Sequence, residues 1–125
     1  MTKRILVIDD EEGIREIIQI SLNAASEWEV LTATSGKEGL LIAATQQPQA
    51  ILLDVMMPEM DGVETFKQLR LGVATSVIPT IMLTAKTTTR EQQLLIDLGV
   101  TGVIAKPFKA KDLVAQIRVI LNWTN

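Results

Sequence analysis

Short apolar runs alternate with amphipathic stretches along the whole chain. The apolar runs occupy residues 5–8, 28–33, 50–53, 80–83 and 103–105, and each is followed by apolar residues at helical spacing. Nearly continuous apolar runs are typical of parallel strands that are buried on both faces. Strict strand–helix alternation with right-handed crossovers predicts helices on both sides of one sheet. We therefore predict an α/β fold of the flavodoxin-like, doubly wound (βα)5 type, with a five-stranded parallel sheet in the order 2-1-3-4-5.

Several of the predicted helices carry start and stop signals. Ser35 can cap the second helix, with Glu38 at capping-box spacing, and this helix is expected to run to about Gln46. The pair Asp61-Gly62 marks a turn and the cap of the third helix. These signals support the same five strand–helix units.

The composition favours one domain and excludes several kinds of site. A chain of 125 residues with 47% hydrophobic content can build one core, so we expect a single domain over residues 1–125, with a further domain left open. The chain has no cysteine or histidine, which excludes thiolate chemistry and zinc held by these residues. With 12 basic and 15 acidic residues and no basic tract, direct nucleic-acid binding is disfavoured. The lack of a signal peptide or a long apolar span predicts a cytoplasmic protein without membrane contact.

Charged and polar residues stand at the carboxyl ends of four of the predicted strands. Asp9 and Asp10 follow the first strand, Asp54 the third and Lys106 the fifth, while Thr84 ends the fourth. In open α/β sheets the carboxyl ends of the strands border the crevice where ligands bind. We therefore expect three carboxylates and one ammonium group to meet at one point.

Such a cluster requires a countercharge beyond one lysine. Two like charges about 4 Å apart repel by about 4 kcal/mol at an effective dielectric constant near 20. With only oxygen ligands available, Mg²⁺ fits best, and Mn²⁺ is the alternative. The predicted ligands are Asp9, Asp10 and Asp54, with the backbone carbonyl of Met56.

A metal of this kind points to a phosphoryl group as the substrate. Mg²⁺ commonly completes its shell with phosphate oxygens, which Lys106 and Thr84 would also contact. No phosphate-binding P-loop is present, so nucleotide hydrolysis is disfavoured. A carboxylate can itself attack phosphorus, and Asp54, alone on the third strand, is the predicted nucleophile.

Four motifs in this order and spacing, VIDDEE, LLDVMMPEMDG, MLTAK and AKPF, resemble the receiver domain of two-component response regulators. The resemblance covers essentially the whole chain. It implies a signalling switch of a phosphorelay, which accepts a phosphoryl group on Asp54 from a phosphohistidine of a sensor histidine kinase or histidine phosphotransfer protein. It also implies the Mg²⁺ and phosphoryl contacts given above, with no catalysis beyond the domain's own phosphorylation and dephosphorylation. A cis Lys106-Pro107 bond and output through the fourth helix, fifth strand and fifth helix are further implications.

The chain departs from the family pattern at one position that matters for output. Val103 stands where the family usually has an aromatic switch residue, so the resemblance leaves the transmission of the signal open. Met56 and Lys86 occupy the positions that tune the lifetime of the acyl phosphate in the family, and no lifetime follows from them.

Alternative interpretations remain at this point. Asp9 and Asp10 on their own could be acidic residues that favour the start of the first helix. An aspartate-nucleophile phosphatase would carry a D-x-D pattern after the first strand and a cap domain, and neither is present. A receiver-like interaction module that does not use an aromatic switch is a second alternative. A flavin carrier is disfavoured because the chain has only two Trp, two Phe and no Tyr to stack on the ring.

Overall fold

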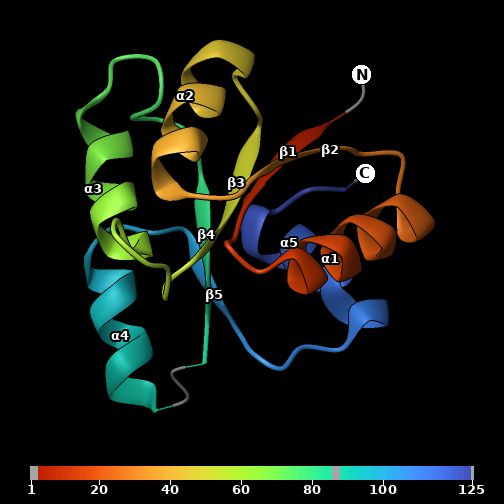
Figure 1. The fold of residues 1–125 in the computed structure, drawn as a ribbon. Helices are drawn as coiled ribbons and strands as arrows, with labels where there is room; N and C mark the ends of the chain where they lie inside the picture. Colours follow the sequence, from red (N-terminus) through yellow and green to blue (C-terminus); the bar gives the residue numbers. More distant parts are fainter. Residues whose placement is uncertain (1–2, 86–87, 125) are drawn as a thin grey trace.

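Five parallel strands form one sheet in the computed structural model, which describes residues 3–85 and 88–124 (Figure 1). The strands are β1 (Arg4–Ile8), β2 (Glu29–Ala33), β3 (Ala50–Asp54), β4 (Thr80–Thr84) and β5 (Gly102–Ala105). Their order is β2-β1-β3-β4-β5, and every neighbouring pair is parallel. The predicted flavodoxin-like fold and strand order are confirmed.

Helices cover both faces of this sheet. They are α1 (Glu12–Ala25), α2 (Gly36–Gln46), α3 (Gly62–Leu71), α4 (Thr89–Asp97) and α5 (Leu113–Leu121), with a short 3₁₀ turn, η1 (Ala110–Asp112), before α5. Figure 1 shows α1 and α5 on one side and α2, α3 and α4 on the other. In the described part of the chain, no helix has the length and apolar character needed to cross a membrane.

The side chains of β1 show how one strand supplies two cores. Leu6 and Ile8 pack with residues of α2, α3 and α4, whereas Ile5 and Val7 pack with residues of α1 and α5. All four side chains are fully buried. Successive residues of a strand point to opposite faces, so an uninterrupted apolar run fills both cores. This double burial holds β1 rigidly at the centre of the sheet and fixes where the residues after it lie.

The packed face of α1 differs from the apolar pattern of its sequence. Ile18 and Leu22 are buried, but Ile17, which shares the same apolar spacing, is 47% exposed. Ser21 is buried in addition, and its hydroxyl donates a hydrogen bond to the carbonyl of Ile17 at 2.6 Å. A hydroxyl satisfied within its own helix can be buried at little cost, so the helix packs around a polar residue that periodicity does not reveal.

The predicted caps of α2 and α3 are present. The Ser35 hydroxyl accepts a hydrogen bond from the Glu38 N–H at 3.1 Å, and the Asp61 carboxylate accepts one from the Glu64 N–H at 2.9 Å. The Glu38 carboxylate reaches back to the N–H of Thr34, the residue before the cap, at 2.7 Å. The reciprocal bond of a capping box thus lies one residue earlier than the usual pattern.

Both tryptophans pack against each other on the α1 and α5 side. The rings of Trp28 and Trp123 meet edge to face, with centroids 5.3 Å apart. Trp28 directly precedes β2 and Trp123 follows α5, so the pair lies at the amino-terminal edge of the parallel sheet. Lys3 and Arg118 place their cationic groups over Trp123 and Trp28, respectively. This contact ties the end of α5 to the start of β2.

Gly62 allows α3 to begin directly against the end of β3. Its N–H donates a hydrogen bond to the carbonyl of Val55 at 2.9 Å. A Cβ at this position would collide with the Asp54 carbonyl oxygen and lie 2.7 Å from the Cα of Val55. The close approach therefore requires glycine, and it fixes the backbone that follows Asp54.

We expect Gly62→Ala to lower the free energy of unfolding by about 1–3 kcal/mol, because backbone must move to admit the methyl group. Urea unfolding followed by circular dichroism measures this change. Gly13→Ala is the matched control, since a Cβ on Gly13 meets nothing within 4 Å and alanine favours the helix by about 0.5–1 kcal/mol. Equal stability of the Gly62→Ala protein and the unsubstituted protein would contradict the close approach.

Candidate functional site

Asp9 is fully buried at the end of β1 and is held by its backbone and its carboxylate. Its N–H donates to the carbonyl of Ala33 at 3.1 Å, which extends the pairing of β1 with β2. Its carboxylate accepts a hydrogen bond from the Glu11 N–H at 2.9 Å, and its carbonyl accepts one from the Arg15 guanidinium at 2.7 Å. Asp9 is therefore a fixed negative charge at the carboxyl edge of the sheet.

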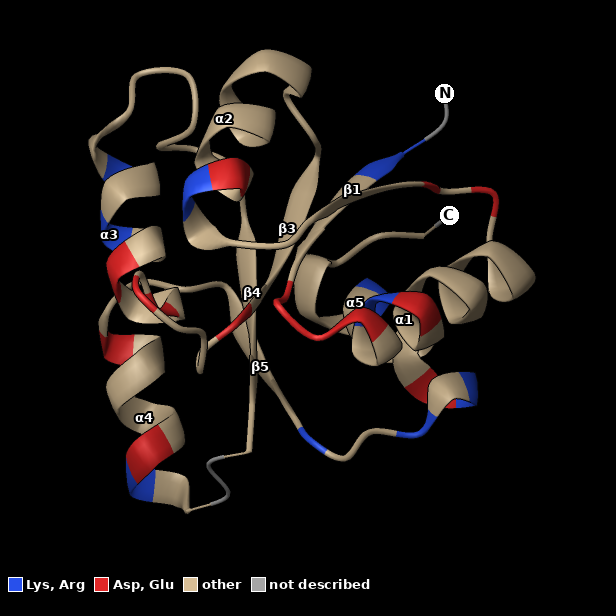
Figure 2. Cartoon of the chain, in the orientation of Figure 1, with Lys and Arg blue, Asp and Glu red and all other residues tan. Residues whose placement is uncertain are grey.

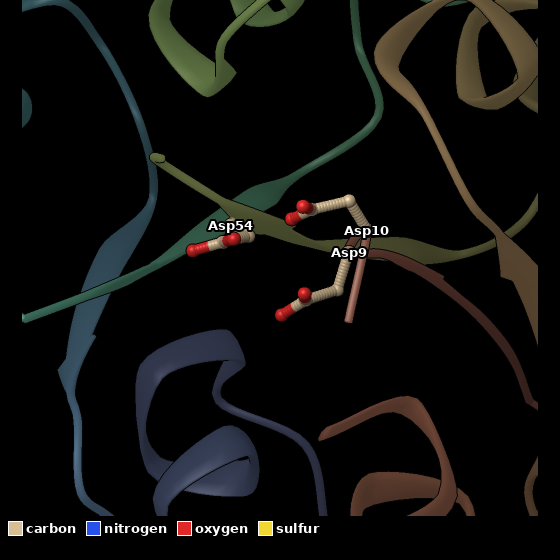
Figure 3. A group of neighbouring side chains, drawn as sticks. All are labelled: Asp9, Asp10 and Asp54. Carbon is tan, nitrogen blue, oxygen red and sulfur yellow. The ribbon is translucent and has the colours of Figure 1, made fainter. Parts of the chain in front are cut away.

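Asp54 and Asp10 complete a group of three carboxylates. Asp54 ends β3 and is 3% exposed, and the next N–H, of Val55, donates to the carbonyl of Leu83 at 3.0 Å. Asp10 is exposed at the start of the loop that leads into α1. One carboxylate oxygen from each of the three residues lies within 4.8 Å of the others. Figure 3 shows the three side chains gathered at the ends of β1 and β3.

Lys106 brings a positive charge to the same point. Its N–H donates to the carbonyl of Thr84 at 2.8 Å, which sets its backbone beside β4. Its Nζ lies 3.0 Å from Asp54 Oδ1 and 3.3 Å from Asp9 Oδ2. The predicted cis peptide bond between Lys106 and Pro107 is present. Figure 2 shows acidic segments at the ends of β1 and β3 and a basic segment after β5.

The other predicted residues lie around this edge of the sheet. Thr84 is buried as the last residue of β4, and Met56 is exposed in the loop after β3. Val103 is half-buried within β5. Lys86, the residue predicted to tune the lifetime of the acyl phosphate, lies outside the described residues.

Sequence reasoning missed two residues that shape the site. Arg15 holds the Asp9 carbonyl from the second turn of α1, and its only sequence signal is a basic residue close to the acidic run. Gly62 permits the contact of α3 with the Asp54 backbone, and its signal, the Asp61-Gly62 pair, indicated a turn without showing that close approach.

Two groups in the site, the Asp54 carboxyl and the Lys106 ammonium, have raised pKa values. For Asp54, burial is the main cause and raises the pKa of the carboxyl, and the nearby Asp9 charge adds to it. The hydrogen bond and charge of Lys106 and the backbone of Met56 act in the opposite direction but do not cancel the burial. For Lys106, burial lowers the pKa, but the hydrogen bonds and charges of Asp54 and Asp9 outweigh it, so the pKa of the ammonium rises.

The donor set fits a hard divalent cation. Three carboxylates against one ammonium leave the ionised cluster with an excess of two negative charges, and only oxygen ligands are offered. These oxygens lie within 4.8 Å of one another, the scale of an octahedral Mg²⁺ shell, which is about 4 Å across. The residues present therefore suit Mg²⁺, and a bound cation would lower the pKa of Asp54 by supplying the missing positive charge.

The sequence of the chain matches one family of known proteins. The sequence model described as "Response regulator receiver domain" matches residues 5–118. The chain is 41% identical over 121 residues to the alkaline phosphatase synthesis transcriptional regulatory protein PhoP of Bacillus subtilis, covering 97% of this chain and 49% of that protein. It is 38% identical over 124 residues to the response regulator MprA of Mycobacterium tuberculosis, covering 99% and 53%. The chain thus spans about half the length of these curated relatives.

Solved structures show the same similarity. The chemotaxis response regulator CheY4 of Vibrio cholerae superposes with a TM-score of 0.89 at 32% identity, over 96% of this chain and 99% of that chain. A putative response regulator from Chloroflexus aurantiacus gives a TM-score of 0.88 at 30% identity, over 98% and 99%. Both solved structures are therefore similar to this chain in sequence as well as in fold.

We expect Lys106→Met to raise the pKa of the Asp54 carboxyl further, because the lysine supplies both the hydrogen bond and the charge that oppose the effect of burial. The midpoint of the Asp54 titration should therefore move to higher pH. The ¹³C chemical shift of the Asp54 carboxyl against pH, in metal-free buffer, measures it. Lys109→Met, which removes an exposed charge three residues later, should leave the midpoint in place. The same midpoint in all three proteins would show that Lys106 does not act on Asp54.

Proposed function

Because the chain belongs to the response regulator receiver domain family, we propose that it is a phosphorelay switch with Asp54 as the phosphoacceptor. Membership in the family implies phosphorylation-dependent signalling, with the domain acting as a switch and not as a conventional enzyme. One observation supports Asp54 as the acceptor: its buried carboxylate lies 3.0 Å from Lys106 Nζ and within the group formed with Asp9 and Asp10. Asp9 is the other described carboxylate paired with this lysine, but at the longer distance of 3.3 Å, and its second oxygen accepts the Glu11 N–H.

The residues of the site have distinct roles in this proposal. One oxygen of Asp54 attacks the phosphorus of a phosphohistidine whose other ring nitrogen carries a proton. The new O–P bond forms as the N–P bond breaks, and the electron pair of that bond leaves with the neutral imidazole. Lys106, already paired with Asp54, stays beside the transferred group and offsets the charge on its oxygens. The hydroxyl of Thr84, at the adjacent strand end, contacts a further phosphoryl oxygen.

Asp9, Asp10 and Asp54 would hold Mg²⁺, with the backbone carbonyl of Met56 as a fourth protein ligand. Mg²⁺ held by these residues would supply positive charge that offsets the charge on the transferring phosphoryl oxygens. Mn²⁺ has the same ligand preference and would substitute for it. The buried and hydrogen-bonded Asp9 carboxylate is the fixed member of this set, whereas the exposed Asp10 can adjust.

The phosphoryl donor would be a partner protein. The chain has no histidine, so a phosphohistidine must come from a sensor histidine kinase or a histidine phosphotransfer protein. In this proposal residues 1–125 form a single receiver domain that does not itself contact nucleic acid or membrane. The curated relatives that are named transcriptional regulators are about twice as long as the chain, so their outputs are not assigned to it.

The surface formed by α4, β5 and α5 would carry the output. A groove of about 500 Å³ lies along β5 and α5 and is lined in part by Val103, Ala105, Ala115 and Val119. Val119 is 81% exposed there, so the groove offers apolar contacts to a partner. With valine at position 103, no aromatic ring can turn inward, and the activated state must reach a partner through shifts of the helices and of β5.

We expect incubation with acetyl phosphate and Mg²⁺ to add one phosphoryl group to the intact protein, and EDTA or Asp54→Ala to abolish the addition. Intact-mass spectrometry measures it directly. Asp97→Ala is the matched control, because Asp97 is exposed on α4 and should not affect labelling. A gain in mass that survives Asp54→Ala would place the acceptor elsewhere and end this proposal.

We expect Asp10→Asn to weaken Mg²⁺ binding by on the order of tenfold or more, because one charged ligand is replaced by a neutral one. Isothermal titration calorimetry with Mg²⁺ measures the affinity. Glu12→Gln serves as the control, since Glu12 is also an exposed acid, lies two residues later and is outside the group of three. If the two substitutions weakened binding equally, the effect would be one of general charge and Asp10 would not be a ligand.

A further inference from the structure

The helix that follows the acidic pair, α1, begins without the side-chain cap that the next three helices have. The side chains of Ser35, Asp61 and Thr88 each accept a backbone N–H bond at the start of α2, α3 and α4. The residue in the same position before α1 is Glu11, and its side chain makes no such bond. A side-chain cap joins the residue before a helix to the first turn. The loop that carries Asp10 into α1 must therefore be held in another way.

The Asp10 side chain has no partner that would hold it in place. It is exposed, and none of the described residues donates a hydrogen bond to its carboxylate. The side chain can rotate, but the points that its oxygens can reach are set by the Asp10 backbone. That backbone begins with the planar peptide group that contains the Asp9 carbonyl and the Asp10 N–H. A residue that binds the Asp9 carbonyl therefore also sets where Asp10 can place its charge.

Arg15 binds this peptide group from α1. Its Nη1 donates to the Asp9 carbonyl at 2.7 Å, a short distance that is typical of a charged donor. Its own N–H donates to the Glu11 carbonyl at 3.1 Å, so one residue binds the carbonyls on both sides of Asp10. The Glu11 N–H donates to Asp9 Oδ1 at 2.9 Å and closes the loop. Together these three bonds define the course of the backbone through Asp10.

The guanidinium of Arg15 binds a carbonyl and not a carboxylate. Among the described residues Arg15 forms no ion pair, whereas Lys106 pairs directly with Asp9 and Asp54. A positive charge beside a cation site repels the incoming ion, so the charge of Arg15 by itself weakens Mg²⁺ binding. The effect of Arg15 on the loop geometry and the effect of its charge therefore have opposite signs, and an experiment can separate them.

We propose that Arg15 is a positioning residue of the cation site, which fixes the Asp10 backbone so that its carboxylate lies beside Asp9 and Asp54. With the loop in this arrangement, one oxygen from each of the three acids lies within 4.8 Å of the others (Figure 3). Ligands that are ordered before binding lose less conformational entropy when the ion arrives, so they bind it more tightly. The role in Mg²⁺ binding rests on the proposed function, whereas the ordering of Asp10 is a property of the metal-free chain.

The order parameter of the Asp10 backbone amide, from ¹⁵N NMR relaxation in metal-free buffer, tests the ordering. We expect a value of about 0.85, as in rigid backbone, in the unsubstituted protein and below about 0.6 in Arg15→Met. Methionine keeps an unbranched apolar side chain and removes the donors and the charge. The amide of Ile51, in β3, should not change. An equally ordered Asp10 in both proteins would overturn the proposal, and so would an equal loss of order at Ile51.

Calorimetric titration with Mg²⁺ separates positioning from charge. We expect Arg15→Met to weaken Mg²⁺ binding by on the order of tenfold, although a positive charge is removed. Arg15→Lys keeps the charge but not the planar fork of donors, so its affinity should lie between the two. Lys37→Met is the matched control: Lys37 is an exposed cation at the start of α2, and its loss should leave Mg²⁺ binding unchanged or tighten it. Unchanged or tighter binding in Arg15→Met would overturn the proposal.

A double-mutant cycle shows whether Arg15 acts through Asp10. In the Asp10→Asn protein, Arg15→Met should change the Mg²⁺ affinity by less than about twofold, because the carboxylate that Arg15 positions is gone. An equal loss of affinity with and without Asp10→Asn would overturn the proposal. Failure of the unsubstituted protein to bind Mg²⁺ would count against the proposed function, and the order parameter of Asp10 would still decide the role of Arg15.

Discussion

The ion pairs that Lys106 makes with Asp54 and Asp9 depend on the parallel arrangement of the central strands. These three residues are up to 97 positions apart in the chain, and they meet because β1, β3 and β5 are parallel members of one sheet. Two buried carboxylates side by side would be costly without this cation, and the cation itself is buried only because they accept its hydrogen bonds. The site is therefore a group of paired charges, with negative charge in excess, on a rigid apolar base.

Much of the fold was predictable because strand burial leaves a simple sequence signal. Residues 50–53 are apolar without interruption, and this pattern fits few structures other than a central parallel strand. The meeting of Asp9, Asp54 and Lys106 followed from topology, since carboxyl ends of parallel strands share one edge. Contacts that depend on the three-dimensional course of loops could not be predicted. Arg70 and Arg15 reach backbone carbonyls on other segments, and nothing in their sequence neighbourhoods identifies those partners.

The molecule combines a rigid part with a more loosely held one. The strands that carry the acids are buried on both faces, so the charges at their ends cannot drift apart. On the α2, α3 and α4 side, α4 has a single buried residue and lies beside an apolar groove. A change of charge at Asp54 would therefore displace first the least tightly packed part nearby, which is α4, across the groove from Val55.

The pairing of Trp28 with Trp123 determines what the intrinsic tryptophan fluorescence of the protein can report. Both indoles sit in a single cluster, at the opposite edge of the sheet from the acids, so the chain contains one optical probe and not two independent ones. Detachment of the last turn of α5 from the start of β2 would separate the rings and change the emission spectrum. Native fluorescence therefore reports whether the end of α5 stays packed against the start of β2.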